Sequence, residues 1–245
     1  MADGTIRTGI AGWSIASRDA DLFPREGTHL SRYATRLDMA EINSSFHRPH
    51  RRTTYERWAE NTPPAFRFAV KLPRTITHER RLEDCEDLVH RFADEIAGLG
   101  EKRDPLLVQL PPSFAFPGAT AEGFFRMLAE TIHGPIVCEP RHPSWFTADI
   151  DALLDRLKVT RVAADPAPVA QAAKPGGWRG LAYFRLHGSP RIYWSPYTPE
   201  AIERHADTVT ALADDGVETW TVFDNTASGA AIADALALIE TLRRH

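Results

Sequence analysis

Residues 66–110 read FRFAVKLPRTITHERRLEDCEDLVHRFADEIAGLGEKRDPLLVQL, and they contain one complete strand–helix–strand unit. The first six residues alternate between large apolar side chains and others, which predicts a strand ending at Lys71. A helical pattern then covers residues 83–99 and ends at Gly100, and a second apolar strand, Leu106–Leu110, follows. This unit favours two parallel strands that are joined by a crossover helix.

The same alternation of strands and helices continues along the whole chain. The predicted strands are Ile6–Gly12, Met39–Asn43, Phe66–Lys71, Leu106–Leu110, Ile136–Glu139, Thr160–Ala164, Leu181–His187 and Thr219–Phe223. The predicted helices begin near Thr28 or Ser31, Thr53 or Thr54, Glu83, Thr120, Thr147 or Asp149, Pro199 (with Thr198 as its cap) and Ala230. Residues 167–180 are rich in Ala, Pro and Gly, and we expect a loop there in place of a helix.

Eight strands in alternation with helices predict an α/β fold, a single (β/α)8 TIM-barrel-like domain over residues 1–245 with one crossover helix reduced to a loop. The alternative is an open, doubly wound sheet. Such a sheet usually has a glycine-rich phosphate loop after its first strand, and residues 9–14 do not have that pattern.

The composition is that of an ordinary globular protein. The 245 residues are 43% hydrophobic and 25% charged, which allows a substantial core. The net charge of −4 argues against attraction of the whole protein to nucleic acid or an anionic membrane, but not against a local basic patch. Cys85 and Cys138 are expected to be reduced thiols. The sequence has no signal-peptide pattern and no bilayer-length apolar stretch, so we expect a cytoplasmic protein without a membrane partner.

Polar residues follow nearly every predicted strand. In a (β/α)8 barrel the carboxyl ends of the strands meet at one face, which is where such barrels have their active sites. The expected catalytic residues are Glu41, Lys71, Glu139, Asp165 and His187. The expected substrate-binding residues are Asn43, Gln109, Arg141, His142, Trp145, Arg185, Asp224 and Asn225.

Arg185 and His187 are two residues apart in a strand, so their side chains share one face. A guanidinium group suits a carboxylate or phosphate, and an imidazole can exchange protons near neutral pH. The alternative is that Arg185 forms a buried structural ion pair with Glu139 or Asp165.

Glu41 and Asn43 also share a face, and Glu41 could act as a base or pair with Lys71. Lys71 could form an imine if burial lowered its pKa, but we expect it to be a fixed cation because nearby carboxylates would hold it charged. Trp145 is either a flat wall for a ligand ring or a core residue at a helix entry.

Carboxylates with an imidazole can bind a hard metal ion. Three cations, Lys71, Arg141 and Arg185, would share this pocket, and no His-Glu-x-x-His or paired-cysteine spacing is present. We therefore predict neither a metal nor a cofactor. Residues 47–81 are locally basic and could attract anions to the pocket rim or form a solvated surface of Arg–Glu pairs.

Five motifs in order resemble the YecE-type DUF72 family. They are AEINSSF at residues 40–46, FAVKLPRTITH at 68–78, VQLPPSF at 108–114, EPRHPSW at 139–145 and YFRLHG at 183–188. The resemblance covers nearly the whole chain and implies a TIM-barrel fold, but no established activity. Where the family commonly ends its last strand in Phe-Asn-Asn, this chain has Phe223-Asp224-Asn225.

The residues favour an enzyme that uses acid–base chemistry on a small anionic or phosphorylated metabolite, as a metal-independent hydrolase, lyase or isomerase. One alternative is a nucleic-acid-processing or repair protein that uses the basic segment 47–81 on a phosphate backbone. Another is a non-catalytic module that holds a ligand or partner with the aromatic residues Tyr193, Trp194 and Tyr197.

Overall fold

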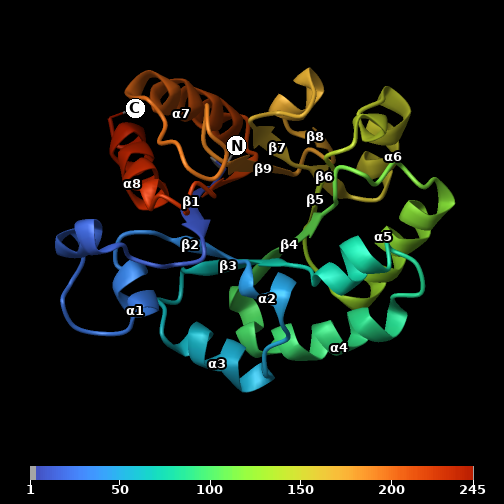
Figure 1. The fold of residues 1–245 in the computed structure, drawn as a ribbon, viewed down its shortest axis with the longest axis horizontal. Helices are drawn as coiled ribbons and strands as arrows, with labels where there is room; N and C mark the ends of the chain where they lie inside the picture. The colour runs from blue at the N-terminus through green and yellow to red at the C-terminus, as the bar shows by residue number, and fades with distance from the viewer. Residues whose placement is uncertain (1–3, 245) are drawn as a thin grey trace.

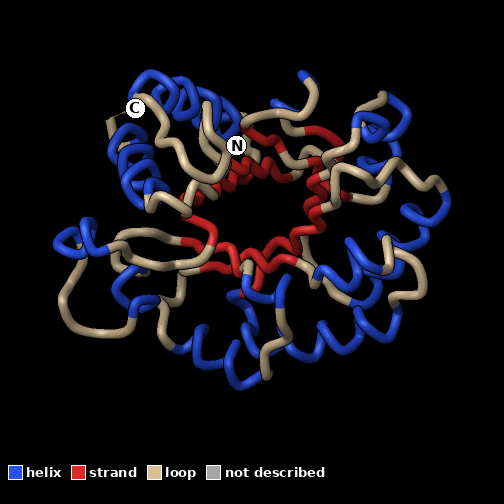
Figure 2. The backbone as a smooth tube through the Cα atoms, in the orientation of Figure 1, coloured by secondary structure: helices blue, strands red, loops and turns tan. Residues whose placement is uncertain are grey.

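The computed structural model describes residues 4–244 as a ring of strands enclosed by helices (Figure 1, Figure 2). The strands are β1 (Ile6–Ala11), β2 (Met39–Ile42), β3 (Arg67–Lys71), β4 (Arg103–Gln109), β5 (Ile136–Glu139), β6 (Val159–Arg161), β7 (Ala163–Asp165), β8 (Gly176–Gly177), β9 (Leu181–Leu186) and β10 (Glu218–Phe223). The α-helices are α1 (His29–Tyr33), α2 (Ser44–His47), α3 (Arg52–Glu60), α4 (Glu86–Ile96), α5 (Ala119–Thr131), α6 (Ala148–Arg156), α7 (Pro199–Asp214) and α8 (Ala230–Leu242).

The sheet closes into a barrel through an interrupted sixth strand. The strand order is β7-β9-β10-β1-β2-β3-β4-β5-β6-β8. Strands β6 and β7 are separated only by Val162; β6 pairs with β5 and β7 pairs with β9, in both cases in parallel. The two ends of the strand order are therefore joined by the chain itself, and the predicted (β/α)8 barrel is confirmed.

The predicted loss of one crossover helix is also confirmed. Between β7 and β9 the chain forms only a short 3-10 helix, Ala170–Ala173, and the two-residue strand β8, which pairs antiparallel with β6. The outer face of β7 and β9 consequently has no crossover helix of its own, and a hollow lies there against α7.

Helix starts follow the predicted caps in three cases. The side chains of Thr28, Thr147 and Thr198 accept hydrogen bonds from backbone N–H groups in the first turns of α1, α6 and α7. The other predicted caps were wrong: α3 begins after Arg51 and α5 after Gly118, and neither residue makes a side-chain cap bond. Helix α2, directly after β2, was not predicted.

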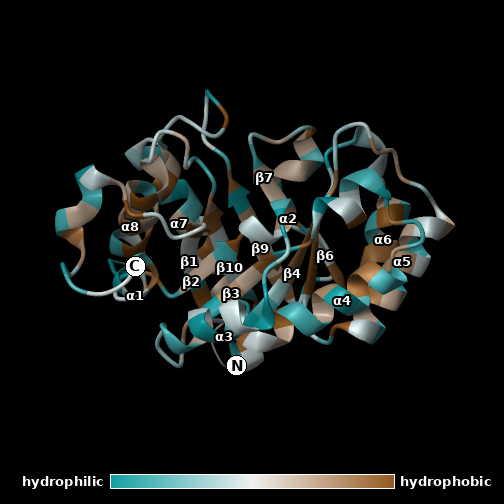
Figure 3. Ribbon diagram, turned by 60° about the horizontal axis from the view of Figure 1, so that its bottom comes forward, coloured by the Kyte–Doolittle hydropathy of each residue, from teal (hydrophilic) through white to brown (hydrophobic). Residues whose placement is uncertain are grey.

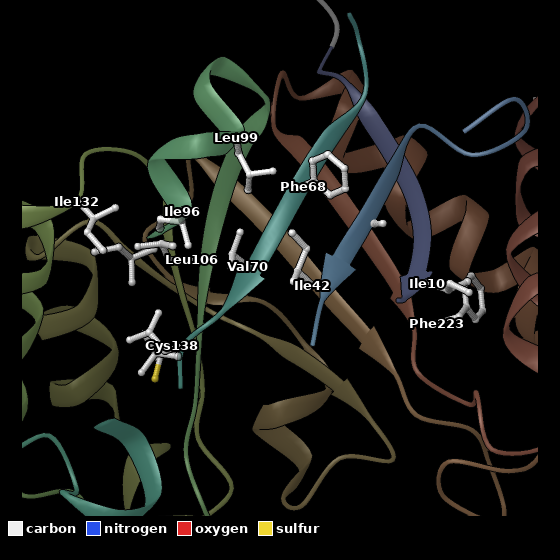
Figure 4. Packing of buried hydrophobic residues seen from close by; sticks show 14 of the residues in the cluster. Ile10, Ile42, Phe68, Val70, Ile96, Leu99, Leu106, Ile132, Cys138 and Phe223 are labelled. Atoms are coloured by element: carbon white, nitrogen blue, oxygen red, sulfur yellow. The ribbon is translucent and has the colours of Figure 1, made fainter. Parts of the chain in front are cut away.

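Strand alternation divides the apolar residues into an outer and an inner core. Outward-facing residues pack against the helices, as Phe68 and Val70 of β3 do near Ile96 and Leu99 (Figure 4). Inward-facing residues form a separate layer that fills the barrel: Met39, Ala69, Leu107, Val137, Val162, Leu181, Tyr183, Trp220 and Val222. Hydrophobic colour in Figure 3 accordingly gathers on the strands and on the helix faces next to them.

Two further sequence expectations concern thiols and membranes. Cys85 and Cys138 are both free and buried in the structure. Within residues 4–244 we find no helix with the length and apolar character that crossing a bilayer requires.

Candidate functional site

The inward-facing apolar layer ends in a layer of polar side chains at the C-terminal ends of the strands. Each polar residue stands two positions after an apolar one and so points the same way. The pairs are Met39 and Glu41, Ala69 and Lys71, Leu107 and Gln109, Val137 and Glu139, Tyr183 and Arg185, and Val222 and Asp224. The repeated spacing places six strand-end side chains over one floor inside the barrel.

Arg185 is the centre of this layer. Its Nε and Nη2 atoms donate to both carboxylate oxygens of Glu41, at 3.0 and 2.7 Å. Its Nη1 donates to Glu139 Oε2 at 2.7 Å, and its Nη2 donates also to Asp224 Oδ2 at 2.8 Å. The Arg185 side chain is 0% exposed. The guanidinium therefore binds three carboxylates at the ends of three other strands and presents no surface to a ligand.

The alternative of a buried ion pair is thus the geometry observed for Arg185, with Glu139 as expected but with Glu41 and Asp224 in place of Asp165. Glu41 is fully buried, and its Oε2 also accepts a hydrogen bond from Tyr183 at 2.8 Å. Burial of charge is costly unless each group is paired and hydrogen-bonded, and this cluster meets that condition.

His187 lies between two of these carboxylates. Its Nε2 is 2.9 Å from Glu139 Oε1, and its Nδ1 is 3.1 Å from Asp224 Oδ2. Burial alone would lower the pKa of His187, but the charge of Glu139 and the two hydrogen bonds raise it above 6.5. With both ring nitrogens donating, the imidazole is a cation of the cluster.

The two carboxylates that hold His187 are kept ionised. Burial raises the pKa of Glu139, but Arg185, His187 and Arg141 outweigh it and hold that pKa well below 4.5. Asp224 behaves in the same way, since Arg185 and His187 overcome its burial and lower its pKa. Glu139 and Asp224 are therefore both deprotonated near neutral pH.

Arg141 forms the edge of the cluster. Its Nη2 donates to Glu139 Oε1 at 3.2 Å and to the Tyr193 hydroxyl at 3.1 Å. The side chain is 22% exposed, and its Nε and Nη1 bond to no residue in the range 4–244. Unlike Arg185, this guanidinium keeps donors free for a ligand.

Tyr193 belongs to the loop after β9, which comes over the site. Its backbone N–H donates to the His187 carbonyl, and its ring meets the His187 ring edge to face at 5.4 Å. Tyr193 is 37% exposed, and its neighbours Ile192 and Trp194 are 44% and 45% exposed. Tyr197, by contrast, bonds to the backbone of Gly188 and Asp165 and fastens this loop to the barrel.

Lys71 differs from the other charged residues of the layer because its amine is unpaired. Across residues 4–244 we find no hydrogen bond or ion pair to Lys71 Nζ, although the residue is only 9% exposed. The Nζ atom lies over the Phe46 ring, 4.2 Å from its centroid. Helix α2 sets this contact, since the Ser45 hydroxyl donates to the carbonyl oxygens of Lys71 and Ile42.

The environment of Lys71 makes its amine titrate close to neutral pH. Burial lowers its pKa most, and the positive charge of Arg185 lowers it further. The charges of Glu41, Glu139 and Asp224 oppose these effects, and the resulting pKa is about 8. The pairing of Lys71 with Glu41 that the sequence allowed is absent from the described ion pairs, because Glu41 is bound by Arg185.

His78 stands among the cations of the rim. Burial and then the charges of Lys71, Arg74 and Arg141 lower its pKa to about 4, so the imidazole is neutral at pH 7. Its ring meets that of Phe46 edge to face at 5.0 Å, and its Nδ1 lies 2.9 Å from the Thr77 hydroxyl. The sequence placed His78 only in the basic segment 47–81. Its position in the loop directly after β3, which ends at Lys71, could have indicated that it lies near the site.

Three more of the predicted substrate-binding residues, Gln109, Asn43 and His142, lie at or shortly after strand ends. Gln109 is 6% exposed, and its Nε2 donates to the Leu110 carbonyl at 3.3 Å. Asn43 Oδ1 is buried and accepts no hydrogen bond from the described part of the chain. His142 accepts the Ser144 N–H with its Nδ1 and so caps a short 3-10 helix.

Three predicted site residues lie away from this cluster. Asp165 is the register partner of Leu186, whereas its neighbour Ala164 pairs with Arg185, so Asp165 points outward, into the hollow against α7. Trp145 is fully buried in the outer core and donates its Nε1 hydrogen to the Phe114 carbonyl at 2.9 Å, so its ring forms no ligand wall. The amide of Asn225 donates to Asp234 of α8 and to the Ser195 carbonyl.

The basic segment 47–81 is divided by the fold. Arg52 pairs with Glu56 and Arg74 with Glu79 on exposed surface. Arg67 begins β3 and pairs with Asp104 at the opposite end of the barrel from Lys71. Only part of the segment therefore faces the site. In residues 4–244 no three His, Cys, Asp or Glu side chains are arranged to hold a metal ion.

Comparisons with known proteins agree with the fold and leave the activity open. A profile of the family described as "Protein of unknown function DUF72" matches residues 7–245. The UPF0759 protein YecE of Escherichia coli K12 is 31% identical over 155 residues, and the match spans 60% of this chain and 56% of that relative.

Solved structures of DUF72 family proteins have the same fold. One from Enterococcus faecalis V583 has a TM-score of 0.81 at 20% identity and covers 98% of this chain and 96% of its own. Another, from Thermotoga maritima MSB8, has a TM-score of 0.79 at 23% identity and covers 98% of this chain and 99% of its own.

Proposed function

We propose that this chain, which belongs to the DUF72 family, is an enzyme that performs acid–base chemistry on a small anionic or phosphorylated metabolite at the C-terminal face of its barrel. The observation that carries the proposal is that the amine of Lys71 is unpaired and the guanidinium of Arg141 is partly free, and that both charges act on the same neighbour, His78, next to the paired charge cluster. Free positive charge in a secluded site is what an anion needs for tight binding.

The two sets of charges have different tasks in this proposal. Glu41, Glu139, Asp224, Arg185 and His187 neutralise and hold one another, so they act as positioning residues that fix the floor of the site. Lys71 and Arg141 hold the anionic group of the substrate. Asn43, whose buried Oδ1 has no donor, would accept a hydrogen bond from a substrate hydroxyl.

Proton transfer falls to the groups whose pKa values lie on either side of neutrality. Lys71, with a pKa of about 8, is an acid at pH 7, and His78, with a pKa of about 4, is neutral and can accept a proton. Pairs of titratable groups whose surroundings move their pKa values apart in this way are typical of acid–base sites. The sequence assigned proton transfer to Glu41, Glu139, Asp165 and His187. Asp165 lies outside the cluster, and the other three have hydrogen-bonded partners within it.

Isothermal titration with inorganic phosphate at low ionic strength tests the anion site. We expect wild-type protein to bind phosphate, and Lys71→Met and Arg141→Met each to weaken binding at least about tenfold. Lys174→Met is the matched control, since Lys174 is exposed and follows the short 3-10 helix Ala170–Ala173, and it should bind as wild type does. Equal affinity of wild type and Lys71→Met would remove the proposed site.

Turnover is tested with a pool of sugar phosphates and small carboxylic acids in D2O, followed by proton NMR. Wild-type protein should convert at least one compound or exchange one of its C–H protons for deuterium, and Lys71→Met should not. Conversion by both proteins at the same rate would show that the activity does not come from this site.

A further inference from the structure

The four lysines of the chain have different surroundings, and Lys71 is the exception among them. Lys102 Nζ donates to the carbonyl oxygens of Ala59 and Thr62 and to the Thr62 hydroxyl. Lys158 and Lys174 are exposed. Lys71 is buried, yet its amine has no hydrogen-bond acceptor within the described residues. An amine in this position keeps its lone pair available whenever it loses its proton.

The backbone of Lys71 is held in place, and its amine rests against one ring. The Lys71 carbonyl is fixed by the Ser45 hydroxyl at 2.6 Å, and β3 pairs Lys71 with Leu107 of β4. The Phe46 ring lies against Nζ and limits where it can move. A nucleophile that is positioned by its scaffold has already lost much of the freedom that a reaction would otherwise cost.

The sequence favoured a permanent cation at Lys71 because nearby carboxylates would hold it charged. In the structure these carboxylates are bound by Arg185, and none of them bonds to Nζ. With a pKa of about 8, about one amine in ten is neutral at pH 7, against well under one in a thousand for an ordinary lysine.

We propose that Lys71 is a catalytic nucleophile, that its amine forms an imine with the carbonyl carbon of a small aldehyde or ketone, and that Arg141 holds an anionic group of the same substrate. This inference rests on the proposed function and narrows its substrate class to anionic carbonyl compounds: Lys71 and Arg141 attract the anion together, and Arg141 keeps hold of it when the amine of Lys71 reacts.

The step balances without a further reagent. The lone pair of Nζ forms the new C–N bond, the C–O bond of the carbonyl breaks, and both amine hydrogens leave with that oxygen as water. When the imine is protonated, its positive charge replaces that of the ammonium group. The charges of Glu41, Glu139 and Asp224, which already favour a cation at this position, favour the iminium in the same way.

Reductive trapping with glyoxylate, a small anionic aldehyde, tests the proposal. Full-length protein is incubated with glyoxylate and sodium cyanoborohydride, and the labelled lysines are identified by peptide mass spectrometry. We expect Lys71 to be labelled at least about tenfold faster than Lys102, Lys158 or Lys174, and inorganic phosphate to slow this labelling. Labelling of Lys71 no faster than that of Lys174 would overturn the proposal.

Arg141→Met provides the matched variant. It should slow the labelling of Lys71 by glyoxylate and leave its labelling by glycolaldehyde, an uncharged aldehyde, unchanged. Equal slowing with both aldehydes contradicts the role given to Arg141. Phosphate binding that needs Lys71, together with absent labelling, rejects the imine but keeps the anion site. Fast labelling without any phosphate binding or protection rejects the anion site and the anionic substrate class.

Discussion

Arg185 and Glu41 face each other across the barrel interior as a doubly hydrogen-bonded ion pair, with N–O distances of 3.0 and 2.7 Å and no exposed surface on either side chain. The two residues are 144 positions apart in the chain. A planar guanidinium matches a carboxylate in this geometry better than any other pair of side chains does. The pair is therefore the structural base of the site and the first place to test it.

Glu41→Gln should destabilise the protein strongly, because it leaves Arg185 with one charged partner fewer in a water-free position. We expect a loss of about 3 kcal/mol in the free energy of unfolding, measured by urea denaturation at pH 7. Glu56→Gln is the matched control, since Glu56 pairs with Arg52 on exposed surface and should lose at most about 0.5 kcal/mol. Similar losses in both variants would mean that the buried pair is no stronger than a surface one.

His187 should make stability depend on pH above neutrality. Because its folded pKa is raised above 6.5, its contribution is fully present below pH 6.5 and is lost as the pH rises through the folded value. The difference in unfolding free energy between wild type and His187→Gln should thus be largest below pH 6.5 and shrink as the pH is raised above it, as measured by urea denaturation at a series of pH values. A difference that grows over this range contradicts a protonated His187.

Lys71→Met should stabilise the protein while it weakens phosphate binding. The folded pKa of about 8 lies below the usual 10.5, so the charged form costs stability, by at most about 3 kcal/mol, at every pH below 8. We expect a gain of about 1–3 kcal/mol at pH 7 that declines as the pH rises from 8 toward 10.5. Lys174→Met should change stability by less than about 0.5 kcal/mol. A less stable Lys71→Met protein would mean that the carboxylates outweigh burial.

The pKa of His78 should report the charge of Lys71. NMR titration of the histidine rings in Lys71→Met should show the His78 pKa rising from about 4 toward 6.5, because one of the charges that lower it is gone. His205 has the same pKa of about 4 through burial alone, so it should stay unchanged. An unmoved His78 would place the two residues too far apart for shared chemistry.

Trp145→Phe should weaken the fold without touching the site. The change removes a buried hydrogen bond and leaves the Phe114 carbonyl unsatisfied, at a cost of about 1–3 kcal/mol in urea denaturation. Phosphate affinity should stay at the wild-type value. Weaker phosphate binding with unchanged stability would instead indicate that the Trp145 ring contacts the ligand.

The barrel was predictable because the same pattern repeats: eight apolar strands recur along the chain in alternation with helical segments. The floor of the site was predictable for the same reason, since Glu41, Glu139, Arg185 and Asp224 each follow an inward-facing residue by two positions. Asp165 and Asn225 were misplaced by neglect of that period. Val162 and Val222 face inward, so Ala164 and Asp224 do as well, and the residue after each turns outward.

Pairing could not be predicted in the same way. The sequence shows that cations and carboxylates share the pocket, but not that one arginine binds all three carboxylates and leaves the lysine alone. That outcome depends on side-chain reach in three dimensions, and so does the contact of Lys71 with Phe46, which follows from the unpredicted helix α2. Tyr193 reaches Arg141 from 52 residues away, across a loop that has no period to predict it.

In this barrel the first strand, β1, pairs with the last strand, β10. Strands near the chain ends are usually the first to separate from a sheet. Here β1 and β10 lie between β2 and β9 in the sheet. The ion pair of Glu41 on β2 with Arg185 on β9 therefore bridges this pair of strands from inside the barrel. Separating β1 from β10 would therefore also draw Glu41 away from Arg185. The charges that form the base of the site thus also link the two strands that flank the paired first and last strands of the barrel.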